Sequence, residues 1–445
     1  MSEVRGKAEA ARKACYALAG LPVEVRDAAL HNIADSIWDQ RDALLEANKR
    51  DQVAAEAMLD RGEITGAMMK RLELTSDKIR EIVDMVRSVA SLDNPIGKTL
   101  YSLELDEGLE LYRVTSPIGV VAVIFESRPD ALSQIACLCL KSGNSVLLKG
   151  GSETRFTNQQ LFTVIRDAGK GIPEGWIQLL EAREDVKQLL EMSDLIDLIV
   201  PRGSNSFVKY IQSNTSIPVL GHSEGVCHVY VDKDAEVGMA VEVCYDSKVQ
   251  YPSVCNAVDA ILVHDDIASM FLPQLLERFA GKVEIRGCSR VLEKVKEGIK
   301  SATEEDWGKE YLDYIVAVRI VDDLDEAVEY INSYGSHHTD AVVTSCDEAA
   351  LRFMGAVDSA SVFWNTSTRF ADGYRYGLGS EVGISTGKIH ARGPTGLDGL
   401  TIYKYYLKGK GHVVADYVGA EAKVFKHRPV NKKWVQTRTT SLPDD

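Results

Sequence analysis

Short, continuous apolar runs alternate with helix-like segments from Gly119 onward, and this alternation limits the possible folds more than any other feature. The run GVVAVIFE precedes a predicted helix that opens at Pro129–Asp130 and closes at Gly143. SVLLKG, WIQLLE and LIDLIVP are further strand-length runs, each with a helical stretch after it. Because these runs are apolar throughout, their strands must be covered on both faces. They predict a parallel sheet with helices on each side.

A second series of the same kind begins near CHVYVDKDAE and continues through VDAILVH, KVEIRG, IVAVRIV and TDAVVTS. A chain of 445 residues exceeds what one hydrophobic core usually supports. We therefore expect an α/β fold with two doubly wound lobes. A cleft between such lobes is a favoured place for a ligand.

The flanking segments have different patterns. The first hundred residues are predicted to be helical, with Ala29, Ile33 and Ile37 on one apolar stripe. Alternation on both sides of Asp106–Gly108 predicts a two-stranded hairpin over Tyr101–Val114. A free hairpin is marginal in water, so it should pack against another element or another subunit. LTIYKYYLKGKGHVVADYV returns to strand character before a polar tail.

Charge and cysteine use exclude several classes of protein. The net charge of −15 argues against general nucleic-acid binding, which needs clustered positive charge. The N-terminal segment resembles neither a signal peptide nor a transit peptide, and no apolar run approaches the roughly 20 residues that cross a bilayer. The eight cysteines show no paired spacing, which is typical of a reducing compartment. A cytoplasmic protein without membrane or nucleic-acid partners is expected.

No metal site is predicted. Cys227 and His228 lie near His222 in the sequence, but they stand at the start of a predicted strand, where ligand spacing is poor.

Two strand-to-helix turns have the chemistry of phosphate sites, although no G-x-G-x-x-G follows an early strand. LLKGGSE ends a strand at Lys149 and opens a helix near Ser152–Glu153, and LIVPRGSNSF opens a helix at Gly203–Ser204. Helix N-termini present free N–H groups to anions. One such turn is commonly only a cap, but two, each with a cation (Lys149, Arg202), favour a dinucleotide site.

Cys255 lies on a bend in KVQYPSVCNAVDAILVH, behind Pro252 and between the two predicted lobes. Such a thiol is either a partly buried structural group or a nucleophile facing a cleft, and the local pattern leaves both interpretations open. A catalytic thiol needs nearby cations or a helix N-terminus to ionise. Beside a nicotinamide, it permits a covalent thioester that exchanges hydride with the cofactor.

Long motifs then occur in a recognisable order: VIFESRPDAL, LLKGG, DLIVPRGSN, PVLGHSEGVCHVYVD, YPSVCNA, HHTDAVVT, STRFADGYRYGLGSEVGIST and HARGPTGL. From about Leu111 to Asp416 the chain resembles the γ-glutamyl phosphate reductases of the aldehyde dehydrogenase superfamily. The resemblance implies an aldehyde dehydrogenase-like fold with a small β-hairpin oligomerisation element. The implied divisions are an NADPH-binding domain (1–98 and 116–228), a catalytic domain (229–393), an oligomerisation hairpin and strand (99–115 and 394–420) and a C-terminal tail (421–445).

The resemblance implies NADPH-dependent reduction of L-γ-glutamyl 5-phosphate to L-glutamate 5-semialdehyde with release of phosphate, the second step of proline biosynthesis. Cys255 would be the nucleophile, and its main-chain N–H would donate to the oxyanion. Ser127 would replace an asparagine that donates to the oxyanion in the superfamily. Asn256, which follows Cys255 in the CNA motif, is also a catalytic candidate. The hydrolytic glutamate of oxidising relatives falls on His222, with Glu224 as an alternative base. Competing hypotheses are an oxidising dehydrogenase of a small acidic semialdehyde and a catalytically silent assembly protein.

Further residues follow from the resemblance. Arg128, Asn365, Arg369 and Asp372 are substrate candidates, Asp372 for the α-ammonium, while Arg128 fits a surface ion pair equally well. Ser152 leaves room for a 2′-phosphate, so NADPH is expected over NADH. The cofactor candidates are Lys149, Gly150, Ser152, Glu153, Pro201, Arg202, Gly203, Ser204 and Glu381. A separate glutamate 5-kinase is a candidate partner, and a homo-oligomer (dimer or tetramer) is expected. His337 and His338 have no assigned role.

Overall fold

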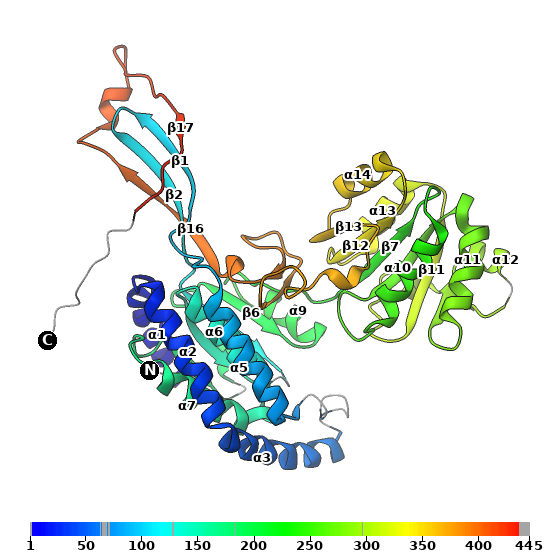
Figure 1. Ribbon diagram of the computed structural model, residues 1–445, viewed down its shortest axis with the longest axis horizontal. Helices are drawn as coiled ribbons and strands as arrows, with labels where there is room; N and C mark the ends of the chain where they lie inside the picture. Colours follow the sequence, from blue (N-terminus) through cyan, green and yellow to red (C-terminus); the bar gives the residue numbers. More distant parts are fainter. Residues whose placement is uncertain are drawn as a thin grey trace.

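Two α/β lobes and a β arm make up the molecule, and the arm rises from the first lobe, far from the second (Figure 1). The computed structural model describes residues 2–62, 64, 69, 72–126, 129–182, 184–295 and 297–435. Among these residues, no helix is both long enough and apolar enough to cross a membrane.

The first lobe is built on a four-stranded parallel sheet in the order β5-β4-β3-β6. Its strands are β3 (Val120–Phe125), β4 (Ser145–Lys149), β5 (Ile177–Leu180) and β6 (Leu198–Arg202). Its helices are α1 (Glu3–Ala19), α2 (Val23–Asp39), α3 (Arg41–Asp60), α5 (Ser76–Ser91), α6 (Pro129–Lys141), α7 (Arg155–Ala168), α8 (Asp185–Leu190) and α9 (Asn205–Ser213), with η1 (Ser152–Thr154) before α7.

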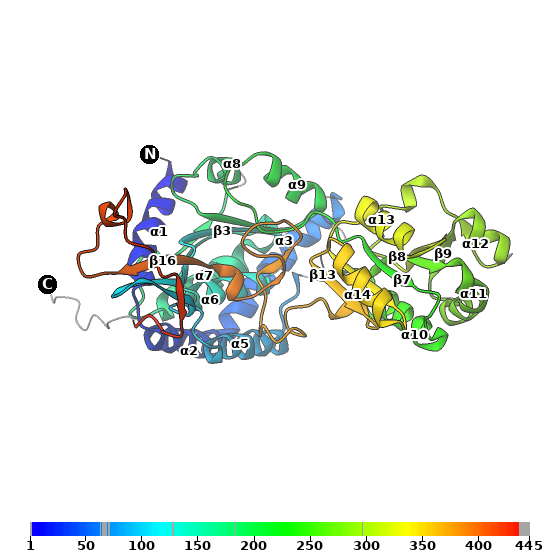
Figure 2. The same ribbon diagram turned by 90° about the horizontal axis from the view of Figure 1, so that it is seen from above.

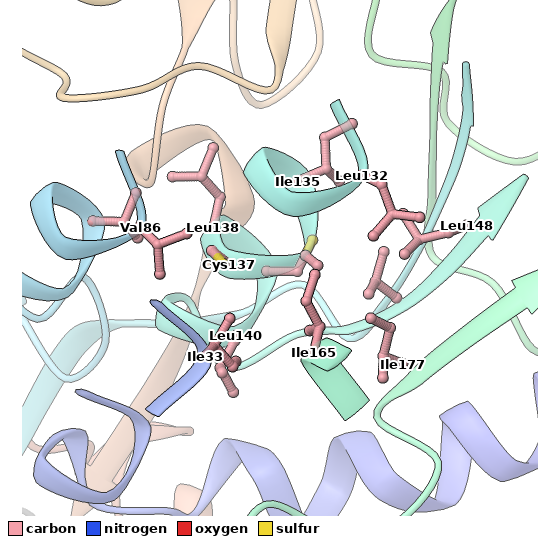
Figure 3. Packing of buried hydrophobic residues seen from close by; sticks show 14 of the residues in the cluster. Ile33, Val86, Leu132, Ile135, Cys137, Leu138, Leu140, Leu148, Ile165 and Ile177 are labelled. Carbon is pink, nitrogen blue, oxygen red and sulfur yellow. The ribbon is translucent and has the colours of Figure 1, made fainter. Parts of the chain in front are cut away.

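Helices cover both faces of this sheet, as its unbroken apolar strands predict (Figure 2). Val121 and Phe125 of β3 pack into a core with α2, α5, α6 and α7, whereas Val120 and Ile124 pack into a second core with α1 and α8. In the first core, Leu138 of α6 lies near Val86 of α5 (Figure 3). Alternate side chains of one strand thus enter two different cores.

The second lobe contains a seven-stranded parallel sheet in the order β10-β9-β11-β8-β7-β12-β13. The strands are β7 (Cys227–Val231), β8 (Val258–His264), β9 (Glu284–Gly287), β10 (Lys300–Ser301), β11 (Ile315–Val321), β12 (Thr339–Val343) and β13 (Ser361–Trp364). The helices are α10 (Val237–Val249), α11 (Asp265–Phe279), α12 (Ser289–Lys294), α13 (Leu324–Tyr334) and α14 (Asp347–Ala356), with the 3₁₀ turn η2 (Glu304–Asp306). Separate cores on its two faces confirm the predicted second α/β series.

The arm is a four-stranded antiparallel sheet in the order β16-β2-β1-β17. It contains β1 (Thr99–Asp106), β2 (Leu109–Pro117), β16 (Thr401–Lys408) and β17 (Arg428–Val430). The remaining pieces are β14 (Gly383–Ser385), β15 (Gly393–Thr395), η3 (Thr368–Phe370), η4 (Asp398–Leu400) and η5 (Val414–Tyr417).

The C-terminal segment differs from the expectation of a tail beginning at residue 421. β17 pairs with β1, and the Trp434 ring stacks on Tyr406 of β16 with centroids 4.6 Å apart. Burial of aromatic surface and pairing with an edge strand explain why this polar-looking segment is ordered. Residues 436–445 lie outside the described part of the chain.

Candidate active site

A cavity of about 330 Å³ lies at the carboxyl ends of β4 and β5. It is lined by Gly150, Gly151, Ser152, Arg155, Asn158, Leu179, Leu180, Glu181 and Ala182. Two predicted cofactor residues, Gly150 and Ser152, therefore line one cavity. Lys149 is nearly buried and its Nζ donates to Gly150 O at 2.6 Å. Glu153 is buried with its carboxylate against Gly151 and is not part of the lining.

Arg155 is a cavity residue that the sequence analysis missed. It opens α7, its side chain is exposed, and its Nη2 lies 3.5 Å from Glu181 Oε2. The signal was present in LLKGGSETR, where a basic residue stands three positions after Ser152. Because α7 begins at the cavity wall, this guanidinium is placed to meet an anion there.

The start of α9 holds a carboxylate at the predicted phosphate position. Ser204 N donates to Glu126 Oε2 at 3.2 Å, and a Cβ at Gly203 would lie 2.7 Å from the same oxygen. Glu126 thus satisfies part of the helix N-terminus that a phosphate would use. Arg202 does not point its Nη1 to this turn: that atom donates to Val382 O at 2.6 Å, beside β14. Pro201 is buried in β6.

Cys255 stands on a turn between α10 and β8, and its side chain is half-buried. Cys227 Sγ donates to Cys255 O at 3.2 Å, from the start of β7. On the other side, Asn256 Nδ2 donates to Ala371 O at 2.8 Å, and Thr368 Oγ1 donates to Asn256 O at 2.7 Å. Asn256 therefore holds the turn in place, and its side chain is buried. Partial exposure leaves the Cys255 thiol accessible, as it also does for Cys288 and Cys346.

Two histidines converge on Cys255. One ligand-capable atom of each of His222, Cys255 and His338 lies within 4.8 Å of the others, and the two imidazole centroids are 4.9 Å apart. The sequence analysis did not bring these three together, although GHSEG and HHTD were among the quoted motifs. It looked for ligands at Cys227 and His228 instead, and His228 Nδ1 is taken by Asp340 Oδ1 at 2.6 Å.

The predicted substrate residues are brought together only in part. Arg369 is mostly buried, its Nε donates to Gln250 Oε1 at 2.9 Å, and burial lowers its pKa while Asp372 and Cys255 act in the opposite direction. The Asp372 carboxylate accepts from Tyr374 N and Arg375 N, at 3.0 and 3.1 Å.

The Asn365 side chain is already hydrogen-bonded to the main chain of Thr344. Its Oδ1 accepts from Thr344 N and its Nδ2 donates to Thr344 O, both at 2.9 Å. A substrate contact at Asn365 would have to use the second N–H of Nδ2 or the second lone pair of Oδ1. Glu381 Oε2 accepts from Gly373 N at 2.8 Å. Ser127 and Arg128 lie outside the described residues. Glu224, the alternative base, pairs with Lys209 at 2.5 Å.

A buried network of charged groups lies next to the turn that carries Cys255. Lys248 Nζ lies 3.3 Å from Asp259 Oδ1, which also accepts from Tyr311 N at 3.1 Å, and Ser253 Oγ donates to Leu312 O at 3.2 Å. Burial raises the pKa of Asp259 to about 6 and lowers the pKa of Lys248. The segment Tyr311–Leu312, which contacts the turn, is thus attached to β8 through Asp259, whose charge is balanced by Lys248.

Asp306 anchors the other end of the same segment. Its carboxylate accepts from Thr303 N at 2.8 Å, from the Tyr311 hydroxyl at 2.7 Å and from Arg286 Nη1 at 2.7 Å. Burial by itself would raise the pKa of Asp306, but these hydrogen bonds outweigh it and hold the pKa well below its usual range.

Comparison with known proteins identifies the family of the chain. The model of the aldehyde dehydrogenase family matches residues 1–285. The chain is 55% identical to a γ-glutamyl phosphate reductase of Natronomonas pharaonis over 96% of its length and 98% of the relative. It is 53% identical to that of Pelotomaculum thermopropionicum, over 95% and 96%. The crystal structure of γ-glutamyl phosphate reductase from Thermotoga maritima superposes with a TM-score of 0.89 at 37% identity, covering 93% of this chain and all of the other.

Replacement of Asp306 by asparagine should lower stability in a pH-dependent way. The folded-state pKa of Asp306 is depressed, so its contribution is present above the unfolded pKa of about 3.9 and is lost as the pH falls through the folded value. At pH 7, Asp306→Asn should lose about 2 kcal/mol of unfolding free energy, typical of hydrogen bonds to a charged group. Urea unfolding at pH 7 and near pH 3 should show the difference shrink. Glu305→Gln, an exposed neighbour, is the control, and an equal loss at both pH values would contradict the prediction.

Proposed function

We propose that the protein reduces L-γ-glutamyl 5-phosphate to L-glutamate 5-semialdehyde and phosphate with NADPH. The premise is that the chain belongs to the aldehyde dehydrogenase family and, within it, to the γ-glutamyl phosphate reductases. The observation that carries this proposal is the half-buried Cys255 on a turn restrained from both sides. In proline biosynthesis this reaction is the second step.

The cysteine divides the reaction into two transfers. The Cys255 thiolate attacks the acyl carbon, the carbon–oxygen bond to phosphate breaks, and a thioester remains. When bound, NADPH would supply the hydride for reduction of this thioester. The carbon–sulfur bond then breaks, which releases the aldehyde and returns the thiolate. The main-chain N–H of Cys255 is the proposed donor to the oxyanion of both steps, and one such donor is commonly worth roughly 3–4 kcal/mol.

Arg369 is the proposed partner of an anionic group of the substrate. Its Nε is fixed by Gln250, while its two Nη atoms make no hydrogen bond within the described part of the chain. A guanidinium held at one nitrogen keeps a rigid fork for phosphate or carboxylate. Asp372 is retained as the proposed α-ammonium partner, where the substrate would share its carboxylate with Arg375 Nη1, 3.4 Å from Asp372 Oδ2.

The cavity at β4 and β5 fits the adenosine end of the cofactor. Ser152 places a small hydroxyl there, and Arg155 adds an exposed cation that a 2′-phosphate would draw away from Glu181, which also lines the cavity. Both features favour a 2′-phosphate, which supports NADPH over NADH. The pyrophosphate is proposed to bind at the start of α9, which requires Glu126 to yield its place on Ser204 N. Glu381 is the proposed contact for the nicotinamide ribose.

Reduction is favoured over the oxidising alternative by the residues around Cys255. An oxidising relative needs a carboxylate that activates water beside the thioester. His222 occupies the place expected for that glutamate, and the Glu224 carboxylate is paired with Lys209. A reductase whose acyl donor is an activated phosphate has no need for a hydrolytic base.

The assembly and setting of the enzyme are also proposals. The arm exposes apolar side chains on β1 and β16, which are Leu100, Tyr101, Ile402, Tyr403, Tyr405 and Leu407. A patch of this kind on a monomer is typical of an interface, so a dimer or tetramer through the arm is proposed. A cytoplasmic location and delivery of the substrate by a separate glutamate 5-kinase complete the proposal.

Inorganic phosphate should decide the direction of the chemistry. The reverse of the proposed reaction consumes phosphate, so NADP⁺ reduction with L-glutamate 5-semialdehyde should occur only when phosphate is added. Phosphate-independent turnover would contradict the assignment to a reductase.

Cys255→Ser should lose at least about 10³-fold in turnover, since it removes the nucleophile, yet keep its NADPH affinity. Cys346→Ser, at an equally half-buried cysteine, is the control and should keep its turnover.

Removal of Arg155 should weaken binding of NADPH but not of NADH. A charge-assisted hydrogen bond contributes roughly 1.5–3 kcal/mol, which corresponds to about a 10- to 100-fold rise in Kd for NADPH in Arg155→Ala. Arg166→Ala is the matched control, because Arg166 is also exposed on α7 but pairs with Asp167 outside the cavity. Equal losses for both cofactors, measured by fluorescence titration, would show that Arg155 does not bind the 2′-phosphate.

Charges placed on the arm should reduce the oligomer. The double variant Tyr403→Asp/Tyr405→Asp buries two carboxylates if these side chains form the interface, which is strongly unfavourable. Sedimentation equilibrium should find a multiple of the chain mass for the wild type and a smaller mass for the variant. Tyr374→Asp, also exposed but outside the arm, should leave the mass unchanged. A wild-type monomer at micromolar concentration would refute the proposed interface.

A further inference from the structure

Three metal-ligating side chains meet at one place from distant parts of the sequence. His222 lies in the segment between β6 and β7, Cys255 on the turn before β8, and His338 directly before β12. Their ligand atoms all lie within 4.8 Å of one another. The cofactor and substrate roles proposed above do not require two imidazoles at the sulfur.

The hydrogen bond of His222 defines its free nitrogen. Its Nδ1 lies 2.8 Å from Ile384 O, and a carbonyl only accepts, so Nδ1 carries the proton. Burial lowers the pKa of His222, which favours the neutral ring. Nε2 therefore presents a lone pair. A main-chain carbonyl that holds the outer nitrogen of a metal-ligating histidine is a common arrangement around protein metals.

His338 has an unsatisfied nitrogen at the same place. Its side chain is 1% exposed, and its Nδ1 lies 2.9 Å from Thr339 Oγ1. Its Nε2 has no hydrogen-bond partner among the described residues. A buried polar atom without a partner is costly, which calls for a ligand at Nε2. His337 next to it is not equivalent, since its Nδ1 lies 2.7 Å from Asp358 O.

Thiolate sulfur and imidazole nitrogen are both ligands of Zn²⁺ in tetrahedral sites, and the same three donors bind copper in trigonal sites. With Zn–N of about 2.0–2.1 Å and Zn–S of about 2.3 Å, a tetrahedral ion needs ligand atoms about 3.3–3.6 Å apart. The separations, which are at most 4.8 Å, have to close by no more than about 1.5 Å. Rotation of the half-buried Cys255 side chain can shorten the two sulfur–nitrogen distances, and the imidazoles have to approach each other by tilting.

We propose that His222 Nε2, Cys255 Sγ and His338 Nε2 bind a zinc ion, with the fourth position open, and that bound zinc inhibits the enzyme. The ion coordinates the sulfur lone pair that must attack the substrate, so the zinc-bound enzyme has no nucleophile. The binding site depends only on the geometry of the three side chains, whereas the inhibition also rests on the proposed function of Cys255.

Cobalt is the spectroscopic probe of this site. Co²⁺ added to the reduced, metal-free, full-length enzyme should give tetrahedral d–d bands and a thiolate-to-cobalt charge-transfer band that saturate at one equivalent. Zn²⁺ should displace them. Cys255→Ser should lose the charge-transfer band, and Cys346→Ser should keep it. Absence of that band in the wild type, or its survival in Cys255→Ser, would overturn the proposal.

The adjacent histidines provide a matched pair of variants. His338→Asn should raise the Kd for Co²⁺ at least about tenfold, since even second-shell changes commonly cost that much. His337→Asn should leave the Kd unchanged, and asparagine tolerates the positive φ of 60° at that position. Because His338 is buried, His222→Gln is a second test with the same expectation, and circular dichroism verifies folding. Wild-type affinity in both His222→Gln and His338→Asn would refute the site.

The activity measurement separates the two proposals. Micromolar Zn²⁺ should abolish turnover, and a chelator should restore it. Metal binding is measured without substrate. If the protein is an active reductase but binds no cobalt, only the zinc site is refuted. A protein that binds cobalt through Cys255 but turns over without phosphate would instead overturn the proposed reaction.

Discussion

Gly225 lets the main chain before β7 pass so close to Cys255 that any Cβ at position 225 would lie 2.2 Å from Cys255 O. This contact is possible only for glycine, and it brings β7 within reach of the turn. The Cys227 thiol then bonds the same carbonyl, and Asn256 ties the turn to the segment after η3. The turn that carries the sulfur is therefore held on both sides by hydrogen bonds between side chains and the main chain, independent of any ligand. Preorganisation of this kind is what a covalent catalyst requires.

The charged groups beneath the Cys255 turn are paired with opposite charges, whereas several polar atoms around it make no hydrogen bond among the described residues. Lys248 and Asp259 neutralise each other beneath the turn, and Asp306 holds the neighbouring segment through several donors. By contrast, the Nη atoms of Arg369 and Nε2 of His338 make no hydrogen bond within the described chain. The first group of contacts stabilises the protein, and the second contains the atoms that we propose for substrate and metal binding. Glu126 belongs to neither group, because it occupies a helix N-terminus that the cofactor is proposed to use.

Much of the architecture was readable from local patterns, and particular residues show where this ended. The predicted strands and the helix after GVVAVIFE all formed, because an apolar run of strand length has few other ways to be buried. The turn of Cys255 and the place of Ser152 at a strand end were also predicted. The polar segment that forms β17 was missed, because its stability comes from the edge of β1 and from Tyr406. The hydrogen bond from Arg202 to Val382 was not predicted, because the two residues are 180 positions apart in the sequence.

By itself, the sequence determined the two α/β series, the helical N-terminus, the hairpin and the cysteine on a bend, since each depends on the spacing of apolar and polar residues within one short segment. Only the tertiary structure decided that His222 and His338 lie beside Cys255, that Arg155 faces Glu181, and that Asn365 is bound to Thr344. These contacts join residues on different elements. They follow from the order of parallel strands in each sheet, which the individual apolar runs do not specify.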